Sequence, residues 1–362
     1  MKPIETPAYR PTASCIWNSF RSSGKRHLFL TGGRGSGKTT LLKALFPENQ
    51  PGLTTWAEPR KAVYLQENLT GETVQVGAFD ATLPGPGNQM MLVQDGFATL
   101  GITALARCVD SDSSWVTIDE IGYLEAQHEG YHAALHRLLA EKQVAAVIRK
   151  QELPFLQGLL RRDDAFVVDL DDPFGQIGCV IMASGLGKRF GGNKLMAEFH
   201  GQPLIGSALA ATEGIFAQRV VVTRHADVAR FCEGRGVKAV LHQLPNRNDT
   251  VRLGLEALHG VDRCMFVPAD QPLLKQETVA ALALAAVNEP DVMWRPVCEG
   301  TPGAPVIFPQ GAFEELLHLP EGKGGGVLTK KYPERLRTVN VRDMDELRDI
   351  DTPEDLQALL ER

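Results

Sequence analysis

The sequence predicts an α/β protein made of two doubly wound domains with mainly parallel sheets. Three observations favour this fold. Short apolar runs alternate with helix-like segments, two of these runs break directly into glycine-rich loops that carry cations, and others end in carboxylates. Buried parallel strands have continuous apolar sequences, and their ligands bind at the carboxyl ends of the strands. At 362 residues, the chain is long enough for two domains with a core each.

The composition narrows the class of protein. Hydrophobic residues make up 43% and charged residues 23%, which is typical of a soluble globular protein. A net charge of −6 without a run of Lys or Arg argues against a nucleic-acid partner. Residues 1–15 carry Pro, Glu and Thr where a secretory signal needs an apolar core, and no apolar stretch approaches the roughly 18–20 residues of a membrane span. We therefore expect no membrane association. The six cysteines are scattered without C-x-x-C spacing, so we expect reduced thiols in a cytoplasmic protein.

The first glycine-rich loop, residues 32–39 (GGRGSGKT), satisfies the G-x-x-x-x-G-K-[ST] pattern of a P-loop. An apolar run at 27–30 precedes it and a helix-like segment at 40–45 follows it, which disfavours the alternative of a chance glycine-rich turn. In such a loop, backbone N–H groups surround the β-phosphate, the lysine reaches the β- and γ-phosphates, and the next hydroxyl binds Mg²⁺. We therefore expect ATP or another nucleoside triphosphate to bind at Gly32, Gly33, Gly35, Gly37, Lys38, Thr39 and Thr40.

A second part of this site is expected at the end of residues 115–120 (WVTIDE), an apolar run that ends in two carboxylates. Asp119 is expected to hold magnesium through water, and Glu120 to polarise the attacking water. Taken alone, the run could equally be an ordinary strand end, but its pairing with the upstream loop favours the catalytic interpretation. Arg149 and Lys150 follow another apolar run, where they either sense the γ-phosphate or end a solvated strand.

Segments of the first half resemble the small cancer-related nucleoside-triphosphatase family. They are TGGRGSGKTTL at 31–41, GLTT at 52–55, LTGE at 69–72 and IDEIGYLE at 118–125. The resemblance covers about residues 25–170 and implies a compact α/β domain that hydrolyses nucleoside triphosphates slowly, with little base preference. The Pro- and Gly-rich residues 84–87 predict a loop, which is a candidate lid, and no residue in it indicates a ligand.

The two domains are expected to meet where residues 163–174 (DDAFVVDLDDPF) end in an acidic, proline-containing turn. We place the linker near 171–177, which gives a P-loop domain at 1–172 and a second domain at 177–362. In the second domain, apolar runs at 219–223, 237–241 and 265–267 alternate with helix-like segments. This alternation predicts another parallel sheet with its ligand at the carboxyl ends of the strands.

The second glycine-rich loop follows the apolar run 179–182. It has glycines at positions 185, 187, 191 and 192 and cations at 188, 189 and 194. Glycine lets backbone N–H groups approach an anion, and the cations neutralise it. The loop therefore predicts a phosphate site. Asp270, just after the run 265–267, adds a carboxylate at the end of another strand.

Four segments of the second half resemble the molybdenum cofactor nucleotidyltransferases in order and spacing. They are SGLGKRFGGNKL at 184–195, ADQPLL at 269–274, GTPGAPVIF at 300–308 and DIDTPEDL at 349–356. The resemblance covers about residues 177–362 and implies a Rossmann-like nucleotidyltransferase domain. It further implies a Mg²⁺-dependent reaction that joins a nucleoside monophosphate from CTP or GTP to the terminal phosphate of molybdopterin and releases pyrophosphate.

The resemblance assigns roles to residues of the loop. The triphosphate is expected to lie against Ala183, Gly185, Gly187 and the N–H groups that follow. Arg189 is expected to bind the leaving pyrophosphate, and Lys194 to lie at the α-phosphate, where charge grows in the transition state. No strong general base is required, because a phosphate monoester with a second pKa of about 6 is already an anionic nucleophile.

Two carboxylates are the expected metal ligands of this site. Asp270 matches the magnesium ligand of the family, and Asp351 occupies the place of a second metal-binding Asp or Asn. The alternative for Asp351 is a plain helix-start residue, because Thr-Pro-Glu follows it. Residues 246–251 resemble the R-x-x-[ST]-V segment with which cytidylyltransferases of isoprenoid synthesis contact their nucleotide, so Thr250 is either a nucleotide contact or a helix N-cap.

Departures from the family pattern bear on the substrate. Relatives usually open the loop with Ala-Ala-Gly, which goes with CTP, or Ala-Gly-Gly, which goes with GTP, whereas residues 183–185 are Ala-Ser-Gly. The segments RFGGNKL and DIDTPEDL favour CTP. Ala304 stands where relatives often carry histidine, and the glycine-rich residues 322–326 are either a substrate loop or a mobile surface turn.

Three functions are consistent with these patterns. The first is an enzyme of molybdenum cofactor maturation that transfers a nucleotide with its second half and hydrolyses nucleoside triphosphates with its first. The second keeps the fold but uses another phosphorylated acceptor, such as a sugar phosphate. The third is a nucleotide-switched chaperone that delivers cofactor to a molybdoenzyme or maturation partner without transferase activity.

Overall fold

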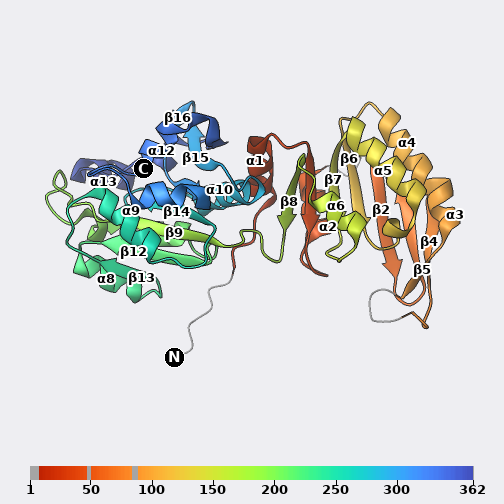
Figure 1. Ribbon diagram of the computed structural model, residues 1–362, viewed down its shortest axis with the longest axis horizontal. Coiled ribbons are helices and arrows are strands. Elements are labelled where there is room, and N and C mark those ends of the chain that lie inside the picture. Colours follow the sequence, from red (N-terminus) through yellow and green to blue (C-terminus); the bar gives the residue numbers. More distant parts are fainter. Residues whose placement is uncertain (1–7, 47–49, 84–88, 362) are drawn as a thin grey trace. The chain divides into compact units, whose positions relative to one another are not determined.

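The computed structural model describes residues 8–46, 50–83 and 89–361, and the chain divides into two units (Figure 1). One unit is Gly24–Pro173, and the other joins Phe174–Arg362 to the N-terminal segment that ends at Ser23. Both contain helices and a mostly parallel sheet, which confirms the predicted α/β class. The predicted loop at 84–87 lies outside the described residues.

The Gly24–Pro173 unit has an eight-stranded sheet in the order β5-β4-β3-β2-β6-β7-β1-β8. The strands are β1 (His27–Thr31), β2 (Gly52–Glu58), β3 (Ala62–Glu67), β4 (Thr73–Phe79), β5 (Met90–Leu92), β6 (Trp115–Ile121), β7 (Gln143–Ile148) and β8 (Ala165–Asp169). Strands β2, β6, β7, β1 and β8 run parallel, and β3, β4 and β5 extend the sheet as antiparallel strands. The helices are α2 (Lys38–Leu45), α3 (Gln94–Gly96), α4 (Ile102–Asp110), α5 (Glu129–Glu141) and α6 (Pro154–Leu160).

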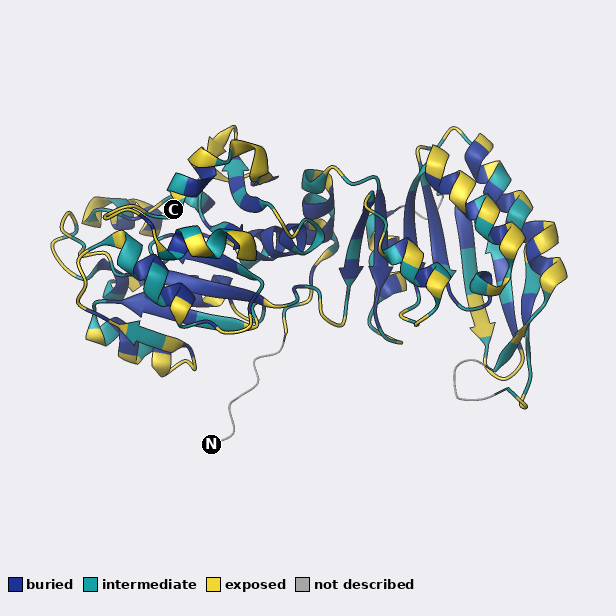
Figure 2. Cartoon of the chain, viewed as in Figure 1, coloured by how far each residue is buried: buried dark blue, intermediate teal, exposed yellow. Residues whose placement is uncertain are grey.

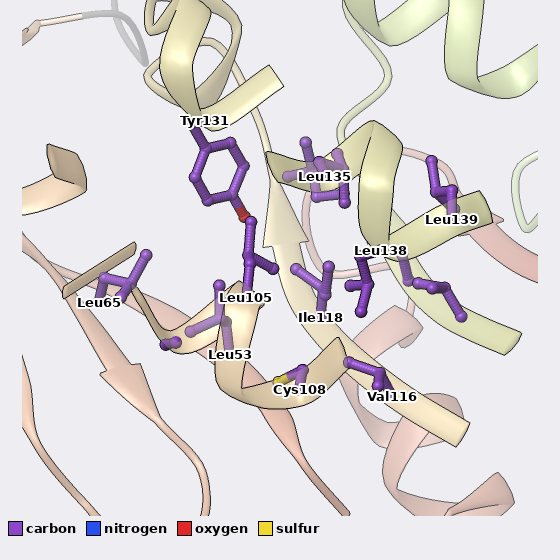
Figure 3. Close-up of a cluster of buried hydrophobic side chains, with 14 of the residues drawn as sticks. Leu53, Leu65, Leu105, Cys108, Val116, Ile118, Tyr131, Leu135, Leu138 and Leu139 are labelled. Carbon is purple, nitrogen blue, oxygen red and sulfur yellow. The ribbon is translucent and has the colours of Figure 1, made fainter. Parts of the chain in front are cut away.

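The core of this unit includes residues from one face of the sheet and from helices α4 and α5 (Figure 3). Alternate residues of β6, Val116 and Ile118, belong to it together with Leu105 of α4 and Leu135 and Leu138 of α5. Strand β1 is buried along its whole length. Because parallel strands share the direction of their carboxyl ends, the loops after β1, β6 and β7 open on the same edge of the sheet.

The second unit has a sheet in the order β13-β12-β9-β14-β17-β15-β16, with β18 paired to β15. The strands are β9 (Ile177–Ala183), β12 (Gln218–Thr223), β13 (Lys238–Leu241), β14 (Arg263–Pro268), β15 (Met293–Cys298), β16 (Thr301–Pro302), β17 (Val306–Pro309) and β18 (Leu336–Asn340), beside a separate hairpin of β10 (Glu198–Phe199) and β11 (Gln202–Pro203). The helices are α1 (Ala13–Ser23), α7 (Ile205–Ala211), α8 (Ala226–Glu233), α9 (Arg247–Glu256), α10 (Gln276–Asn288), α11 (Phe313–Leu317), α12 (Gly326–Lys331) and α13 (Pro353–Leu360).

Strand order places a topological switch point between β9 and β14. The chain builds β9, β12 and β13 outward in one direction and then returns to add β14, also parallel, on the other side of β9. Strand β9 is almost entirely buried, as the dark centre of this sheet in Figure 2 illustrates. In open α/β sheets ligands bind outside the carboxyl ends of the strands at such a point. The glycine-rich loop after β9 and Asp270 after β14 therefore open on one site.

Helix α1 packs in the second unit, whereas the sequence assigned residues 1–172 to the P-loop domain. Ser19 Oγ donates a hydrogen bond to the carbonyl of Ala281 at 2.9 Å, and Thr12 Oγ1 donates one to Glu277 at 2.9 Å. Every residue of α10 from Thr278 to Ala286 is buried. A helix that is apolar all round needs cover on every side, and α1 supplies part of it. The P-loop unit is thus an insertion between α1 and β9.

Within residues 8–46, 50–83 and 89–361, no helix combines the length and the apolar character that crossing a membrane needs.

Gly254 marks a close approach of α9 to the sheet. A Cβ atom at this position would lie 2.4 Å from Cγ1 of Val180 in β9. Gly254→Val is therefore expected to lower the free energy of unfolding by about 2–3 kcal/mol through overpacking, measured by urea denaturation. Gly311→Val is the control, because a Cβ at Gly311 meets no atom within 4 Å. Equal losses in the two variants would contradict the assignment of this contact.

Candidate functional site

A cavity of about 750 Å³ opens at the carboxyl edge of β9 and β14. Six of the residues predicted for nucleotide transfer line it, namely Gly185, Gly187, Arg189, Thr250, Asp270 and Asp351. Ala183 is buried at the end of β9 and does not line the cavity. Position 187 needs glycine, because its φ is 58° and a Cβ there would lie 2.1 Å from the carbonyl oxygen of Gly192.

Lys194 does not itself line the cavity, but it joins the two predicted carboxylates that do. Its Nζ donates to Asp270 Oδ2 at 2.7 Å, to the carbonyl of Ile350 at 2.6 Å and to Asp351 Oδ1 at 3.4 Å. The residue is 9% exposed, so burial places this cation where its charge is weakly screened. Arg189, on the glycine-rich loop, forms an ion pair with Asp351 Oδ2 at 2.7 Å. The structure thus brings together the four charged residues that the sequence proposed for this site.

A third carboxylate, Asp349, lines the same cavity and was not among the predicted ligands. Burial raises its pKa, and the negative charge of Asp270 adds to the effect. The side chain of Gln271 donates to Asp349 Oδ1 at 2.9 Å, and the backbone N–H of Ile350 donates to the carbonyl of Asp270 at 2.9 Å. The Asp-x-Asp spacing of 349–351 was the available signal, since its two carboxylates lie on either side of this anchored Ile350.

The carboxylates suit magnesium better than a metal that needs a complete protein cage. The described residues contain no group of three or more His, Cys, Asp or Glu arranged to hold a metal ion by themselves. Mg²⁺ keeps several waters and is commonly bound through one or two carboxylates and substrate phosphates. Asp270 and Asp351 provide two such carboxylates beside a loop suited to phosphate, so these residues fit a Mg²⁺–triphosphate complex.

The alternatives of a simple helix start for Asp351 and an N-cap for Thr250 do not match the geometry. The N-cap of α13 is Thr352, whose hydroxyl accepts a hydrogen bond from the N–H of Asp355 at 3.2 Å. At the start of α9, Asn246 is the N-cap, and Asp249 accepts from its N–H at 3.1 Å. Thr250 is inside α9, 2% exposed, and lines the cavity. Neither Asp351 nor Thr250 is therefore the N-cap of a helix.

The hydroxyl of Ser184 is turned toward the protein. Ser184 Oγ donates to the carbonyl of Val222 at 3.1 Å and lies 2.8 Å from His242 Nε2. His242 Nδ1 accepts from the N–H of Leu244 at 3.1 Å, which leaves the proton of the neutral ring on Nε2, pointing at Ser184. Burial lowers the pKa of His242. Both hydrogen-bonding directions of the Ser184 hydroxyl are used, and sequence reasoning missed His242 because it lies 58 residues away.

Ala304 and residues 322–326, both expected near the acceptor, differ in whether they line the cavity. Ala304 lines the cavity, whereas none of residues 322–326 does. Gly326 begins α12, and a Cβ on Gly325 would lie 2.7 Å from the ring of Phe308 in the core. The glycines at 324 and 325 therefore allow close packing.

A cavity of about 740 Å³ in the Gly24–Pro173 unit is lined by the P-loop. Its lining includes all seven predicted loop residues, Gly32, Gly33, Gly35, Gly37, Lys38, Thr39 and Thr40, together with Glu120, Arg149 and Lys150. Gly35 and Gly37 have φ of 79° and 96°, a left-handed backbone that favours glycine. Lys38 Nζ is held by the carbonyls of Gly32 and Gly33 at 2.9 and 2.7 Å.

The two predicted carboxylates of β6 have different surroundings. Asp119 accepts a hydrogen bond from Thr39 Oγ1 at 3.0 Å, so both expected ligands of magnesium meet. Burial raises the pKa of Asp119, and the hydrogen bond from Thr39 opposes this effect. Glu120 instead faces the cavity and forms an ion pair with Arg149 at 2.5 Å. Arg149 therefore lies beside Glu120 in the wall of this cavity, whereas Lys150 pairs with Asp169 and Asp171.

Two carboxylates around this site were not predicted. Asp171, which the sequence placed in the linker, accepts from the N–H of Gly33 in the P-loop at 2.9 and 3.0 Å. Glu125 is 3% exposed, and its Oε2 accepts from the N–H of Gly122 at 2.8 Å, which closes the turn after β6. Burial raises the pKa of Glu125 to about 7. The contact of Asp171 with Gly33 joins residues far apart in the sequence, whereas Glu125 binds Gly122 within the segment 118–125 that the sequence analysis had singled out without giving Glu125 a role.

Comparison with known protein families matches each half separately. Residues 179–336 match the MobA-like NTP transferase domain, residues 65–173 match an NTPase family, and residues 15–68 match an ORC-CDC6-like family. Nucleoside-triphosphatase THEP1 of Thermotoga sp. (strain RQ2) is 29% identical over 154 residues, which are 40% of this chain and 86% of that protein. A probable molybdenum cofactor guanylyltransferase of Aquifex aeolicus is 28% identical over 102 residues, and the match spans 28% of this chain and about half (49%) of that protein. Among solved structures, Rv0371c of Mycobacterium tuberculosis is 22% identical with a TM-score of 0.46, over 52% of this chain and 99% of that one.

The chain therefore joins a segment that matches an NTPase family, residues 65–173, to a segment that matches an NTP transferase domain, residues 179–336, as the sequence predicted. More specifically, its first half is a THEP1-like NTPase domain and its second half is a MobA-like NTP transferase domain.

Asp351 and its neighbour Thr352 offer a matched pair of substitutions. Thr352→Ala is expected to lower the free energy of unfolding by about 1 kcal/mol through loss of the N-cap, and to leave nucleotide affinity unchanged. Asp351→Asn is expected to weaken Mg²⁺–nucleotide binding without affecting the cap. Urea denaturation and isothermal titration with CTP and GTP separate the two effects. The assignment is wrong if Thr352→Ala also reduces nucleotide affinity.

Glu125 is expected to make stability depend on pH. Its pKa is raised from 4.5 to about 7, so its contribution to stability is fully present below pH 4.5 and is lost as pH rises through 7. Glu125→Gln cannot ionise, so its stability relative to the wild type should rise between pH 4.5 and 7, by roughly 3 kcal/mol, and then level off. Urea denaturation from pH 4.5 to 8 measures this, with the exposed Glu129→Gln as the control for charge removal. Parallel curves for wild type and Glu125→Gln would refute the expectation.

Proposed function

We propose that the second half transfers CMP, or GMP, from the nucleoside triphosphate to the phosphate of molybdopterin and releases pyrophosphate. The observation that carries this proposal is the ionic cluster of Lys194, Arg189, Asp270 and Asp351 beside a phosphate-type loop at the switch point. The likeness to a probable molybdenum cofactor guanylyltransferase supports the same reaction class.

The residues present account for the steps of such a transfer. An oxygen of the acceptor phosphate attacks the α-phosphorus, the bond from this phosphorus to the bridging oxygen breaks, and pyrophosphate leaves with the electron pair. Lys194 and Arg189 neutralise charge that grows on the α-phosphate and on the leaving group. Asp270 and Asp351 would hold Mg²⁺, which supplies further positive charge to the triphosphate. The acceptor is already anionic at neutral pH, so positioning and charge neutralisation supply most of the catalysis.

The orientation of Ser184 supports CTP as the donor. Its hydroxyl donates to Val222 and contacts His242, so it has no proton left to donate to a ligand in the cavity that Ser184 lines. In this respect Ser184 resembles the Ala of the Ala-Ala-Gly loops that go with CTP.

The first half, on this proposal, hydrolyses a nucleoside triphosphate such as ATP at the P-loop with Mg²⁺. Thr39 Oγ1 donates to Asp119 at 3.0 Å, and these two residues would hold Mg²⁺, which would supply positive charge to the triphosphate. Glu120 faces the same cavity as Lys38, where it orients the attacking water.

Another phosphorylated acceptor, such as a sugar phosphate, is a second candidate. It is favoured by Ala304, a small residue in the cavity wall where relatives often carry histidine.

The test mixes the full chain with Mg²⁺, labelled CTP or GTP, and either molybdopterin or a panel of sugar phosphates. Molybdopterin is expected to yield a dinucleotide and pyrophosphate, with CTP preferred. Lys194→Ala should lower the transfer rate by about 10²–10³-fold, the usual loss for one charge-stabilising group, while hydrolysis at the P-loop continues. Lys38→Ala should abolish hydrolysis and leave transfer unaffected.

Each outcome decides between the candidates. Pyrophosphate release with a sugar phosphate but not with molybdopterin would replace the first acceptor by the second. No pyrophosphate with any acceptor would refute nucleotidyl transfer.

A further inference from the structure

A second cavity in the Gly24–Pro173 unit, of about 470 Å³, is not required for triphosphate binding. It adjoins the P-loop cavity, because Arg34, Glu120 and Arg149 line both. Its other walls come from β2 and the turn after it, from β3, β4 and β5, and from residues 122–125 after β6. It therefore lies on the β6 side of the P-loop, where Asp119 and Glu120 are expected to act on the γ-phosphate.

The size of this cavity exceeds what hydrolysis needs. A single attacking water occupies about 30 Å³ of liquid, less than a tenth of the available space. Cavities of about 300–1,000 Å³ are typical of small-molecule sites. Space of this kind beside the catalytic Glu120 indicates a second ligand.

One wall is a hairpin that extends past the parallel strands. Strand β2 pairs with β6 only from Gly52 to Thr54 but with β3 as far as Glu58. The extension presents Trp56, which is 39% exposed and stacks on Tyr64 with ring centroids 5.7 Å apart and planes at 28°. Figure 2 shows this end of β2 as exposed. An indole held this way is a rigid surface on which a flat ring stacks.

The polar groups of the cavity define the rest of the ligand. Arg34 and Arg60 are exposed and have no ion-pair partner among the described residues. The Oε1 atom of Glu125 is buried and lacks a hydrogen-bond partner in the described part of the chain. Glu125 is one of the residues that line the cavity, and a buried polar atom without a partner is unusual and costs free energy. The cavity therefore combines an aromatic surface, a buried acceptor and two free cations.

We propose that this cavity binds a phosphomonoester of a heteroaromatic ring, such as a nucleoside monophosphate, next to the γ-phosphate. The ring stacks on Trp56, a ring N–H or amino group donates to Glu125 Oε1, and the phosphate lies between Arg34 and Arg60. The ligand then blocks the path by which water reaches the γ-phosphate, so it slows hydrolysis. Binding at this site does not depend on nucleotidyl transfer by the second half, whereas the slowing of hydrolysis rests on the function proposed for the P-loop; fluorescence and phosphate release test the two separately.

The test titrates the full chain with GMP, CMP and, as phosphate-free and ring-free probes, guanosine and ribose 5-phosphate. Tryptophan fluorescence reports binding, and phosphate release from ATP reports hydrolysis. GMP and CMP are expected to quench fluorescence saturably and to slow hydrolysis without competing with ATP. Guanosine and ribose 5-phosphate should bind at least fivefold more weakly.

Variants place the effect at this cavity. Trp56→Ala should weaken the inhibition by GMP about tenfold, the usual effect of losing one stacked ring. Arg60→Ala should weaken it similarly, whereas Arg137→Ala, which removes an exposed arginine of α5, should leave it unchanged. Lys38→Ala removes the triphosphate anchor but should keep the GMP-dependent quenching.

Three results would overturn the proposal. The first is the absence of saturable quenching with every probe. The second is inhibition that competes with ATP, which would place the monophosphate at the P-loop itself. The third is an unchanged GMP affinity in both Trp56→Ala and Arg60→Ala.

Discussion

The second unit depends on one buried lysine that holds two carboxylates from distant parts of the chain. Lys194 bonds Asp270, 76 residues away, and Asp351, 157 residues away, and also the carbonyl between the carboxylates of Asp349 and Asp351. Removing one partner of such a buried ionic group leaves an uncompensated charge, which is far costlier than losing a surface ion pair. The cluster therefore both closes the C-terminal segment onto the sheet and concentrates charged side chains beside the glycine-rich loop.

Both units use the same structural solution with different strands. In the second unit, β9 provides the glycine-rich loop and its neighbour β14 leads to the carboxylate. In the P-loop unit, β1 provides the loop, and β6, one strand beyond β7, provides the carboxylates. In each case a glycine-rich loop follows a buried strand at the carboxyl edge of the sheet, where N–H groups and cations can face an anion. The fold thus repeats one arrangement of strand and glycine-rich loop, and the residues that follow each strand differ between the two units.

The sequence predicted most of the fold because its signals are local. Apolar runs, glycine-rich loops and strand-end carboxylates are contiguous patterns, and they located β1, β6, β9 and β14 and the loops after them. They did not place α1, because its partner α10 lies more than 250 residues further along the chain. Only the packed structure shows that α1 covers part of the buried surface of α10. They also missed Asp349 and Asp171, whose partners Gln271 and Gly33 lie far away in the sequence, and they gave Glu125 no role although it belongs to the segment 118–125.

By itself, the sequence determined that two glycine-rich, cation-bearing loops of different kinds are joined in one chain, because backbone conformation and charge at each loop follow from adjacent residues. Only the tertiary structure decided which polar atoms face a ligand and which face the protein. Ser184 is the clearest case. Its hydroxyl is bound by Val222 and His242, which β12 and the segment after β13 bring to the end of β9. A hydroxyl can turn toward either side, and the partner that it finds in space, not its place in the sequence, decides what the nucleotide meets.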